Sequence, residues 1–205
     1  MIFNFSNNYK FTTRLKINNE NLEIVNKTKL LGLILTDDLK WDENTTYLVK
    51  KAYQRMQLLR KIASFGASQD EKRTIYILYI RNILEQSCVV WSSRLTVDNI
   101  KDLERVQKAA LKIILNKSFE NYELALQKAN LETLKKRREN LCLKFSKKCL
   151  QNEKTDKIFP LSKKQHIMLK RIEKKYKVKF AKTERLKKSS VPYMQRLLNE
   201  NERKF

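Results

Sequence analysis

The stretch TVDNIKDLERVQKAALKIIL, residues 96–115, decides the fold class because its apolar side chains recur at helical spacing. At steps of three and four lie Ile100, Leu103, Val106, Ala110, Leu111 and Ile114. This period is typical of an amphipathic helix with one face in a core. Thr96 stands directly before the first turn, where a hydroxyl caps free backbone N–H groups. The stretch therefore predicts a helix with these apolar residues facing inward.

The segment 42–66 shows the same helical period. At steps of three and four lie Leu48, Ala52, Arg55, Leu59 and Ile62, and Lys51, Arg55 and Arg60 flank the apolar stripe. Asp42 or Asn44 is the expected N-cap, and Gly66 is a natural C-terminal stop. We therefore expect one long helix between these limits.

The tetrapeptide Ser68-Gln-Asp-Glu71 has the form of a capping box, in which a hydroxyl and a carboxylate satisfy opposite backbone donors. It predicts the start of another helix, which SCVVWSS (87–93) interrupts or ends. The expected stripe of that helix holds Ile75, Leu78, Tyr79, Asn82 and Ile83. Further helices are expected over 120–129 and 131–150, and VPYMQRLLNE (191–200) predicts a short one with Pro192 near its first turn.

The first forty residues favour strands instead of helices. MIFNF (1–5) and KFTTRLKI (10–17) alternate apolar and polar residues. RLKI (14–17) and LEIV (22–25) are the expected arms of a hairpin with NNEN (18–21) as its turn. KLLGLIL (29–35) predicts one apolar strand that ends at the turn TDD, and its Gly32 is typical of a bulge or a close backbone approach.

These patterns predict a mainly α fold: a small N-terminal antiparallel β-hairpin sheet, a helical bundle, and a basic helical or disordered tail. The expected domains are residues 1–41, 42–150 and 151–205. Gly and Pro number two each, too few for the many tight turns of a β-sandwich. Past Pro160 the apolar residues form no long stripe, so we expect that part to stay loose until a partner neutralises it.

The charge balance is strongly basic, with 45 Lys and Arg against 22 Asp and Glu and a net charge of +23. Such a surface attracts nucleic acid phosphates without regard to sequence. Residues 135–205 hold 24 basic and 7 acidic residues, a net +17, which leaves +6 for residues 1–134. Most of the affinity is therefore expected from the tail. An anionic membrane is the weaker rival, because no signal peptide or apolar transmembrane segment is seen.

The three cysteines and the single histidine predict neither a disulfide framework nor a metal site. Cys88, Cys142, Cys149 and His166 include no CxxC pair and lack zinc-knuckle spacing. We expect the thiols to be buried as small apolar groups. A reducing compartment follows, so the predicted location is intracellular, cytoplasmic or nuclear. No cofactor is expected.

Three ordered segments resemble a known family. They are KTKLLGLILTDDLKWDENTTYLVKKAYQRMQLLRKIASFG (27–66), LYIRNILEQSCVVWSSRLTVDNIKDLERVQKAALKIIL (78–115) and LETLKKRRENLCLKFSKKCL (131–150). The series resembles the C-terminal part of reverse transcriptases from non-LTR retrotransposons, the jockey-like LINE elements. The matching positions are Leu31-Gly32, Leu39, Trp41, Lys51-Ala52, Leu59-Arg60, Leu84-Glu85, Val90-Trp91, Leu103-Glu104 and Val106-Gln107. Asn82 stands where the family usually has Pro, which should straighten that helix.

The resemblance implies a palm edge in residues 1–41, a hairpin beside the primer end in 29–41, and a thumb from about 43 to 115. In that family, an RNA-directed DNA polymerase, the catalytic aspartates belong to an upstream palm motif of the Tyr-x-Asp-Asp type. No such motif occurs in this sequence. We therefore expect a truncated fragment that binds template–primer nucleic acid and is not an enzyme. Asp37-Asp38 fits a solvated turn better than a metal site.

The basic side chains of two predicted helices are the candidate contacts to RNA, DNA or an RNA–DNA hybrid. They are Lys50, Lys51, Arg55, Arg60, Lys61, Lys135, Lys136 and Arg137. Each alone could equally be an ordinary solvent-facing charge. Because Arg138 shares the apolar stripe of its helix, we expect at least one of the four basic residues 135–138 to snorkel or to pair internally. Trp41 and Trp91 are expected as core anchors more than as base-stacking platforms.

A second interpretation belongs to a different class of function. The chain could be a helical interaction module that docks an acidic protein. Nucleic acid binding predicts a steep salt dependence with little sequence preference, whereas protein docking predicts stoichiometric binding that survives nuclease treatment. The oligomeric state stays open.

Overall fold

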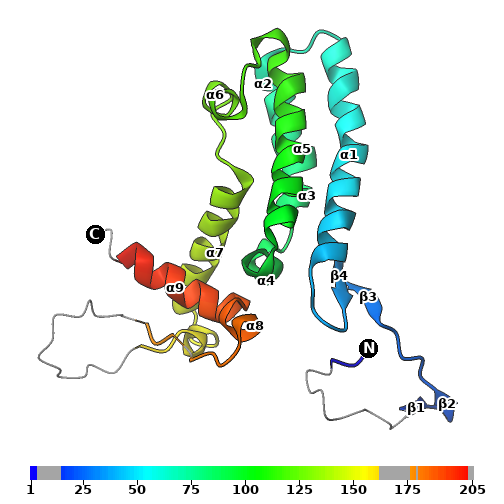
Figure 1. Ribbon diagram of the computed structural model, residues 1–205, viewed down its shortest axis with the longest axis vertical. Coiled ribbons are helices and arrows are strands. Elements are labelled where there is room, and N and C mark those ends of the chain that lie inside the picture. The colour runs from blue at the N-terminus through cyan, green and yellow to red at the C-terminus, as the bar shows by residue number, and fades with distance from the viewer. Residues whose placement is uncertain (4–14, 162–175, 179, 203–205) are drawn as a thin grey trace, which may run out of the picture.

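The computed structural model describes residues 1–3, 15–161, 176–178 and 180–202, and the fold is mainly α, as predicted (Figure 1). The strands are β1 (Lys16–Ile17), β2 (Glu20–Asn21), β3 (Lys27–Leu30) and β4 (Leu33–Thr36). The longer helices are α1 (Asp42–Ser64), α2 (Gln69–Ile75), α5 (Val97–Leu115), α6 (Tyr122–Lys128), α7 (Leu134–Leu150) and α9 (Ser190–Glu202). The short ones are α3 (Asn82–Glu85), α4 (Cys88–Trp91) and α8 (Glu184–Lys187), with the π-helix η1 (Tyr76–Arg81) and the 3₁₀ turns η2 (Ser92–Arg94), η3 (Asn116–Ser118) and η4 (Asp156–Ile158).

The centre of the molecule is a bundle in which α1, the α2–η1–α3 segment and α5 lie side by side (Figure 1). The interior of the bundle is apolar. Its fully buried side chains include Leu48, Met56, Leu59, Tyr76, Ile80, Leu84, Leu103 and Leu111. The α5 prediction is confirmed: Thr96 accepts a hydrogen bond from the Asn99 N–H, and the stripe faces the core with Ile100 half-buried. The capping box at Ser68 and Glu71 is confirmed as well.

The predicted stripe of the second helix is wrong, and the π-helix η1 explains why. A π-helix places more residues in each turn than an α-helix, so the inward face moves off the α period. The buried positions are Tyr76, Ile80 and Leu84, while Leu78 and Tyr79 are 54% and 46% exposed. At Asn82 the π-helix η1 gives way to α3. The Asn82 amide donates to the Leu78 carbonyl (2.9 Å), and the helix ends at Glu85 before Ser87, which has a positive φ.

The start of α1 differs from the expectation too. Its N-cap is Trp41, which offers no side-chain hydrogen bond, and neither Asp42 nor Asn44 takes that role. Asn44 is fully buried, and its Oδ1 accepts from the Ile34 N–H at 3.1 Å. A side chain predicted to be a cap thus fastens β4 to α1. The helix ends at Ser64, and Gly66 follows with φ +81°, as expected for a stop.

The N-terminal strands form two separate two-stranded hairpins. β1 pairs with β2 through a turn at Asn18 and Asn19, both at positive φ, so the turn is shorter than NNEN. The segment 29–35 is not one strand. β3 pairs with β4, and the chain reverses at Leu31 (φ 47°) and Gly32 (φ 85°), so this glycine belongs to a turn and not to a bulge. Of the predicted strands 1–5 and 10–17, residues 4–14 lie outside the described residues.

The C-terminal part of the chain packs back onto the helices where it is described, so the expectation of a loose segment past Pro160 is wrong for Tyr176, which is buried. Helix α9 confirms the prediction for 191–200 and lies against α7, α4 and η2 (Figure 1). A second apolar cluster forms there from Cys142, Cys149, Phe159, Tyr176, Met194 and Leu198. Asn199 exchanges two hydrogen bonds with the backbone of Tyr176, at 2.9 and 3.0 Å. Residues 162–175, also expected to be loose, lie outside the described residues.

Candidate nucleic-acid interface

The first set of predicted contacts lies along α1 and is called here the α1 set: Lys50, Lys51, Arg55, Arg60 and Lys61. Four of these side chains are exposed, and Lys51 is half-buried. Arg55, expected beside the apolar stripe, is exposed, and Met56 next to it is fully buried. No member of the α1 set forms an ion pair with a carboxylate in the part of the chain that the structure describes. Their charges are therefore available to a ligand.

A cationic cluster on β3 extends this surface, and its lysines were not among the predicted contacts. Lys29 donates to the Tyr47 hydroxyl at 3.0 Å and lies 4.9 Å from the centroid of that ring. Lys51 lies 5.8 Å from the same centroid. The hydrogen bond from Lys29, with the charges of Lys51 and Lys29, lowers the pKa of Tyr47. Lys27 and Lys29 are two apart on a strand and so face one side, which is the signal that could have found them.

A shallow hollow of about 410 Å³ lies beside this cluster, between β3, β4 and the first turns of α1. Its lining residues are Lys27, Ile34, Asp42, Glu43, Thr46, Tyr47 and Lys50. The Lys27 Nζ lies 2.9 Å from the Glu43 Oε2 and forms an ion pair with it. Lys50 is the other cation of the lining, and it has no described ion pair. Positive and negative charges balance in this lining, and the hollow alone does not favour an anion.

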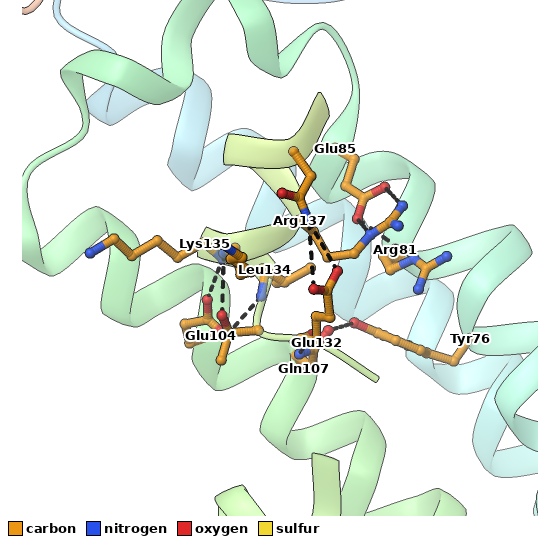
Figure 2. A network of polar contacts seen from close by, with 12 residues as sticks. Tyr76, Arg81, Glu85, Glu104, Gln107, Glu132, Leu134, Lys135 and Arg137 are labelled. Carbon is orange, nitrogen blue, oxygen red and sulfur yellow. Dashed lines mark hydrogen bonds and ion pairs between the residues drawn. The ribbon is translucent and has the colours of Figure 1, made fainter. Parts of the chain in front are cut away.

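The predicted contacts at the start of α7 divide into two kinds. Lys135 and Lys136 are exposed, and Figure 2 shows the Lys135 side chain pointing away from the polar network around it. Arg137 instead donates through Nε and Nη2 to both oxygens of Glu85, at 2.9 and 3.0 Å (Figure 2). This pairing raises the pKa of Arg137. Arg137 therefore connects α7 to α3, and the α7 set of available cations is Lys135 and Lys136.

The pairing of Arg137 with Glu85 confirms that at least one of the four basic residues pairs internally. Arg138 is 2% exposed and so is buried outright. Its guanidinium carbon lies 5.9 Å from the centroid of the Trp91 ring. Trp41 and Trp91 are themselves 5% and 0% exposed, so both pack in the core as expected and neither offers a face to a base.

The first turn of α7 is held by the carboxylate of Glu104 on α5. Glu104 accepts from the backbone N–H groups of Leu134 (3.3 Å) and Lys135 (2.8 Å), the first residues of α7 (Figure 2). Thr133, the N-cap, accepts from the Lys136 N–H. A negative charge at a helix N-terminus also compensates the positive end of the helix dipole. The helix is thus held at its first turn while the lysine side chains point outward.

A buried polar chain continues from Glu104 into the bundle. The Tyr122 hydroxyl donates to Glu104 at 2.5 Å and accepts from the Gln107 amide at 3.0 Å. The Gln107 Oε1 accepts from the Tyr76 hydroxyl at 2.5 Å. Burial raises the pKa of Tyr76 and of Tyr122. Both phenols therefore stay protonated and serve as hydrogen-bond donors, which is a structural role.

The α1 set and the α7 set do not converge on one site. Helix α5 packs against both α1 and α7, and together with α3 it lies between them (Figure 1). The structure thus offers two separate cationic faces.

The acidic pair Asp37-Asp38 lies in the turn before α1. Asp38 accepts from the Lys40 N–H (3.0 Å) and the Thr36 hydroxyl (2.7 Å), which lowers the pKa of its carboxyl to about 2. Within the described ranges, no group of three His, Cys, Asp or Glu side chains could hold a metal ion. Over the same residues, every helix is too short or too polar to cross a membrane.

Comparisons with protein-family models, with curated proteins and with solved structures find no match to this chain.

Proposed function

We propose that this protein binds the sugar–phosphate backbone of RNA, DNA or an RNA–DNA hybrid without sequence preference, and that it does not polymerise nucleotides. In this proposal it corresponds to the palm edge, thumb and post-thumb part of a non-LTR retrotransposon reverse transcriptase. The resemblance of the three segments supports the origin. The proposed binding to nucleic acid is supported only by the exposed cations on the surface of the protein.

The observation that carries the proposal is the set of exposed cations without a described carboxylate partner on α1 and at the start of α7. A lysine or arginine that already pairs with a carboxylate has to give up that pair to contact a phosphate. An unpaired side chain can neutralise a phosphate directly, and the counterion of that phosphate is then released. By contrast, Lys101 and Arg105 on α5 pair with Asp98 and Asp102, three residues earlier. These two paired side chains are therefore less available to a phosphate than the members of the α1 and α7 sets.

The direct test is the affinity for a mixed-sequence RNA–DNA hybrid over a range of salt concentrations. Each phosphate contact contributes about 0.9 to the slope of log affinity against log salt. Neutralising Lys50, Arg55 and Lys61 to Gln should lower that slope by about 2–3 if all three contact phosphates. Neutralising Lys135 and Lys136 to Gln should lower it by up to about 2. Because the two faces are separate, their effects should add.

The matched control is the pair Lys101→Gln and Arg105→Gln, which removes exposed charges that are already paired. It should leave the slope nearly unchanged. The proposal fails if the wild-type protein does not bind the hybrid at low salt, or if a change of base sequence alters affinity strongly. If this chain extended a primer, the proposal that it does not polymerise nucleotides would be contradicted. Binding to a protein partner that survives nuclease treatment would favour the alternative of an acidic protein ligand.

A further inference from the structure

Helix α7 carries an outward row of lysines that extends well beyond its first turn. Its buried residues recur at steps of three and four: Leu134, Arg138, Cys142, Ser146 and Cys149. On the other side of the helix lie exposed lysines, called here the α7 row: Lys136, Lys144, Lys147 and Lys148. None of the four forms an ion pair with a carboxylate in the part of the chain that the structure describes. The row therefore offers unpaired cations along nearly the whole of α7.

Helix α1 is built on the same plan. Lys50 and Lys61 lie on the side opposite its buried residues, and both are exposed. They are eleven residues apart, as are Lys136 and Lys147 of the α7 row. Eleven residues are three helical turns, so each pair of lysines spans about 16 Å. Each helix can thus contact several phosphates of one nucleic acid strand, because successive phosphates rise by about 3.4 Å along the duplex axis.

The outward lysines of α1 and the α7 row face different sides of the molecule. Helices α1 and α7 both pack against α5 and α3, which lie between them (Figure 1). Because these lysines lie opposite the buried side of their own helix, they point away from α5 and α3. Helix α5 with its side chains is about 10 Å wide, so the two sets of lysines are farther apart than that. A straight duplex bound along one helix therefore leaves the lysines of the other helix free.

The surface of α5 between them offers fewer available cations. Lys101 and Arg105 already pair with carboxylates of the same helix. Lys108 and Lys112 are exposed and have no ion pair among the described residues. These two lysines define the alternative arrangement, in which a single duplex lies across α5.

We propose that the protein binds two nucleic acid duplexes at the same time, one along α1 and one along the α7 row, and so bridges them. This inference rests on the proposed function, because each site binds phosphates through unpaired cations. At physiological salt, charges are screened over about 8 Å, which is less than the width of the helix between the two sites, about 10 Å. The two bound duplexes therefore repel each other little, and the net charge of +23 on the protein opposes the repulsion that remains.

The test is a sandwich assay with the full chain and two blunt-ended RNA–DNA hybrids of unrelated sequence. One hybrid carries biotin and is held on streptavidin beads, and the other carries a fluorophore. At low salt we expect the protein to retain the fluorescent hybrid on the beads. Retention should pass through a maximum and fall when the protein is in excess, because each hybrid then binds its own copy of the protein. A protein that binds either hybrid in the salt titration but retains no fluorescence would overturn the inference and leave the proposed function standing, whereas absence of all binding would overturn both.

Two variants that each neutralise one site identify the sites. One variant changes Lys50, Arg55 and Lys61 to Gln, and the other changes the four lysines of the α7 row to Gln. Each variant should still bind one hybrid in solution, but its retention of the fluorescent hybrid should fall to the level of beads without protein. Retention that persists in either variant would show that one site, or a pair of associated copies, is sufficient, and would overturn the inference.

Two matched controls remove exposed charges from α5 in the same protein. The Lys101→Gln and Arg105→Gln pair removes paired cations, and the Lys108→Gln and Lys112→Gln pair removes unpaired ones. Both proteins should retain the fluorescent hybrid as the wild type does. Loss of retention in the second control would place a required contact on α5 and contradict the assignment of the two sites.

Discussion

Lys135 and Arg137 lie two residues apart on α7, but their surroundings are opposite. Lys135 extends into solvent, whereas the Arg137 guanidinium forms two hydrogen bonds to Glu85, whose side chain is 9% exposed. Truncation of these two side chains should therefore have different effects. Loss of Lys135 should lower the affinity for a ligand, whereas loss of Arg137 should lower the stability of the fold.

Arg137→Ala should lower the free energy of unfolding by about 1–3 kcal/mol, because it leaves the Glu85 carboxylate with Arg81 as its remaining described ion partner. Lys135→Ala should change stability by less than about 0.5 kcal/mol and lower the salt slope of hybrid binding by about 1. Urea unfolding and binding titrations on both variants measure the contrast. Equal losses of stability would show that the Glu85 contact does not hold α7.

Glu104→Gln tests the cap of α7. The carboxylate serves three donors: the Tyr122 hydroxyl and the N–H groups of Leu134 and Lys135. An amide offers one oxygen in place of two, so at least one donor loses its acceptor, and we expect a loss of about 1–2 kcal/mol in urea unfolding.

Glu120→Gln is the control for that substitution. Glu120 pairs with Lys128 at the surface, and its side chain is 59% exposed, so its loss should cost about 0.5 kcal/mol or less. A cost at Glu104 no larger than at Glu120 would mean that the cap is not needed to start α7.

The candidate site could be predicted from the sequence only in part. Helical spacing identified Lys50 and Lys61 as outward residues, and both are exposed. The same spacing could not separate Lys135 from Arg137, because the partner of Arg137 is Glu85, 52 residues away. The β3 cluster around Tyr47 was missed because it forms only when the hairpin packs on α1. Local patterns thus predict exposure, whereas pairing depends on contacts distant in sequence.

At the scale of elements, periodicity predicted those helices that keep an α period along their whole length, such as α5. It failed at η1, where the π turn moves the buried face onto Tyr76, Ile80 and Leu84. It also failed at 29–35, because the turn there is Leu31-Gly32 and lacks the Asn-Gly or Asp-Gly signal of a tight hairpin. A leucine at positive φ is uncommon, and no local rule predicts it.

Gly32→Ala should destabilise the β3–β4 hairpin by about 1–2 kcal/mol, because an L side chain at φ +85° is strained. The new Cβ would also lie 2.5 Å from the Gln86 Nε2, and that flexible amide has to move. Thermal unfolding of the purified variant measures the total cost.

Gly66→Ala is the matched control, since Gly66 has φ +81° and a methyl group added there would meet no atom within 4 Å. It should show the backbone cost alone, about 1 kcal/mol. The difference between the two variants then gives the contribution of Gln86. A larger cost at Gly66 would contradict this account of the hairpin turn.

At the scale of the whole molecule, the C-terminal part belongs to the folded body. The Arg185 guanidinium donates to the Asp38 carbonyl, so a C-terminal contact reaches the turn before α1. The Ser190 hydroxyl donates to the Val90 carbonyl at 2.7 Å. The prediction of a loose segment past Pro160 missed Tyr176, which is buried in the second apolar cluster together with Met194 and Leu198 of α9.

Leu198→Ala should therefore lower global stability by about 2–4 kcal/mol, the range for a truncated buried leucine. Leu186→Ala is the control, because Leu186 is 44% exposed and its loss should stay within about 0.5 kcal/mol. Chemical unfolding of both proteins checks the prediction. Similar small effects at the two sites would mean that α9 does not contribute to the core.

The attachment of α7 has a consequence for the order in which the molecule opens. At its first turn, α7 depends on Glu104 and Glu85 from the bundle, and its later turns pack with α9. The bundle, however, has its own apolar core around Leu48, Tyr76 and Leu103. Partial unfolding should thus release α7 and α9 as one cooperative unit while the bundle stays closed. The lysines of α7 would then leave together with the helix, whereas the cationic face of α1 would survive on the bundle.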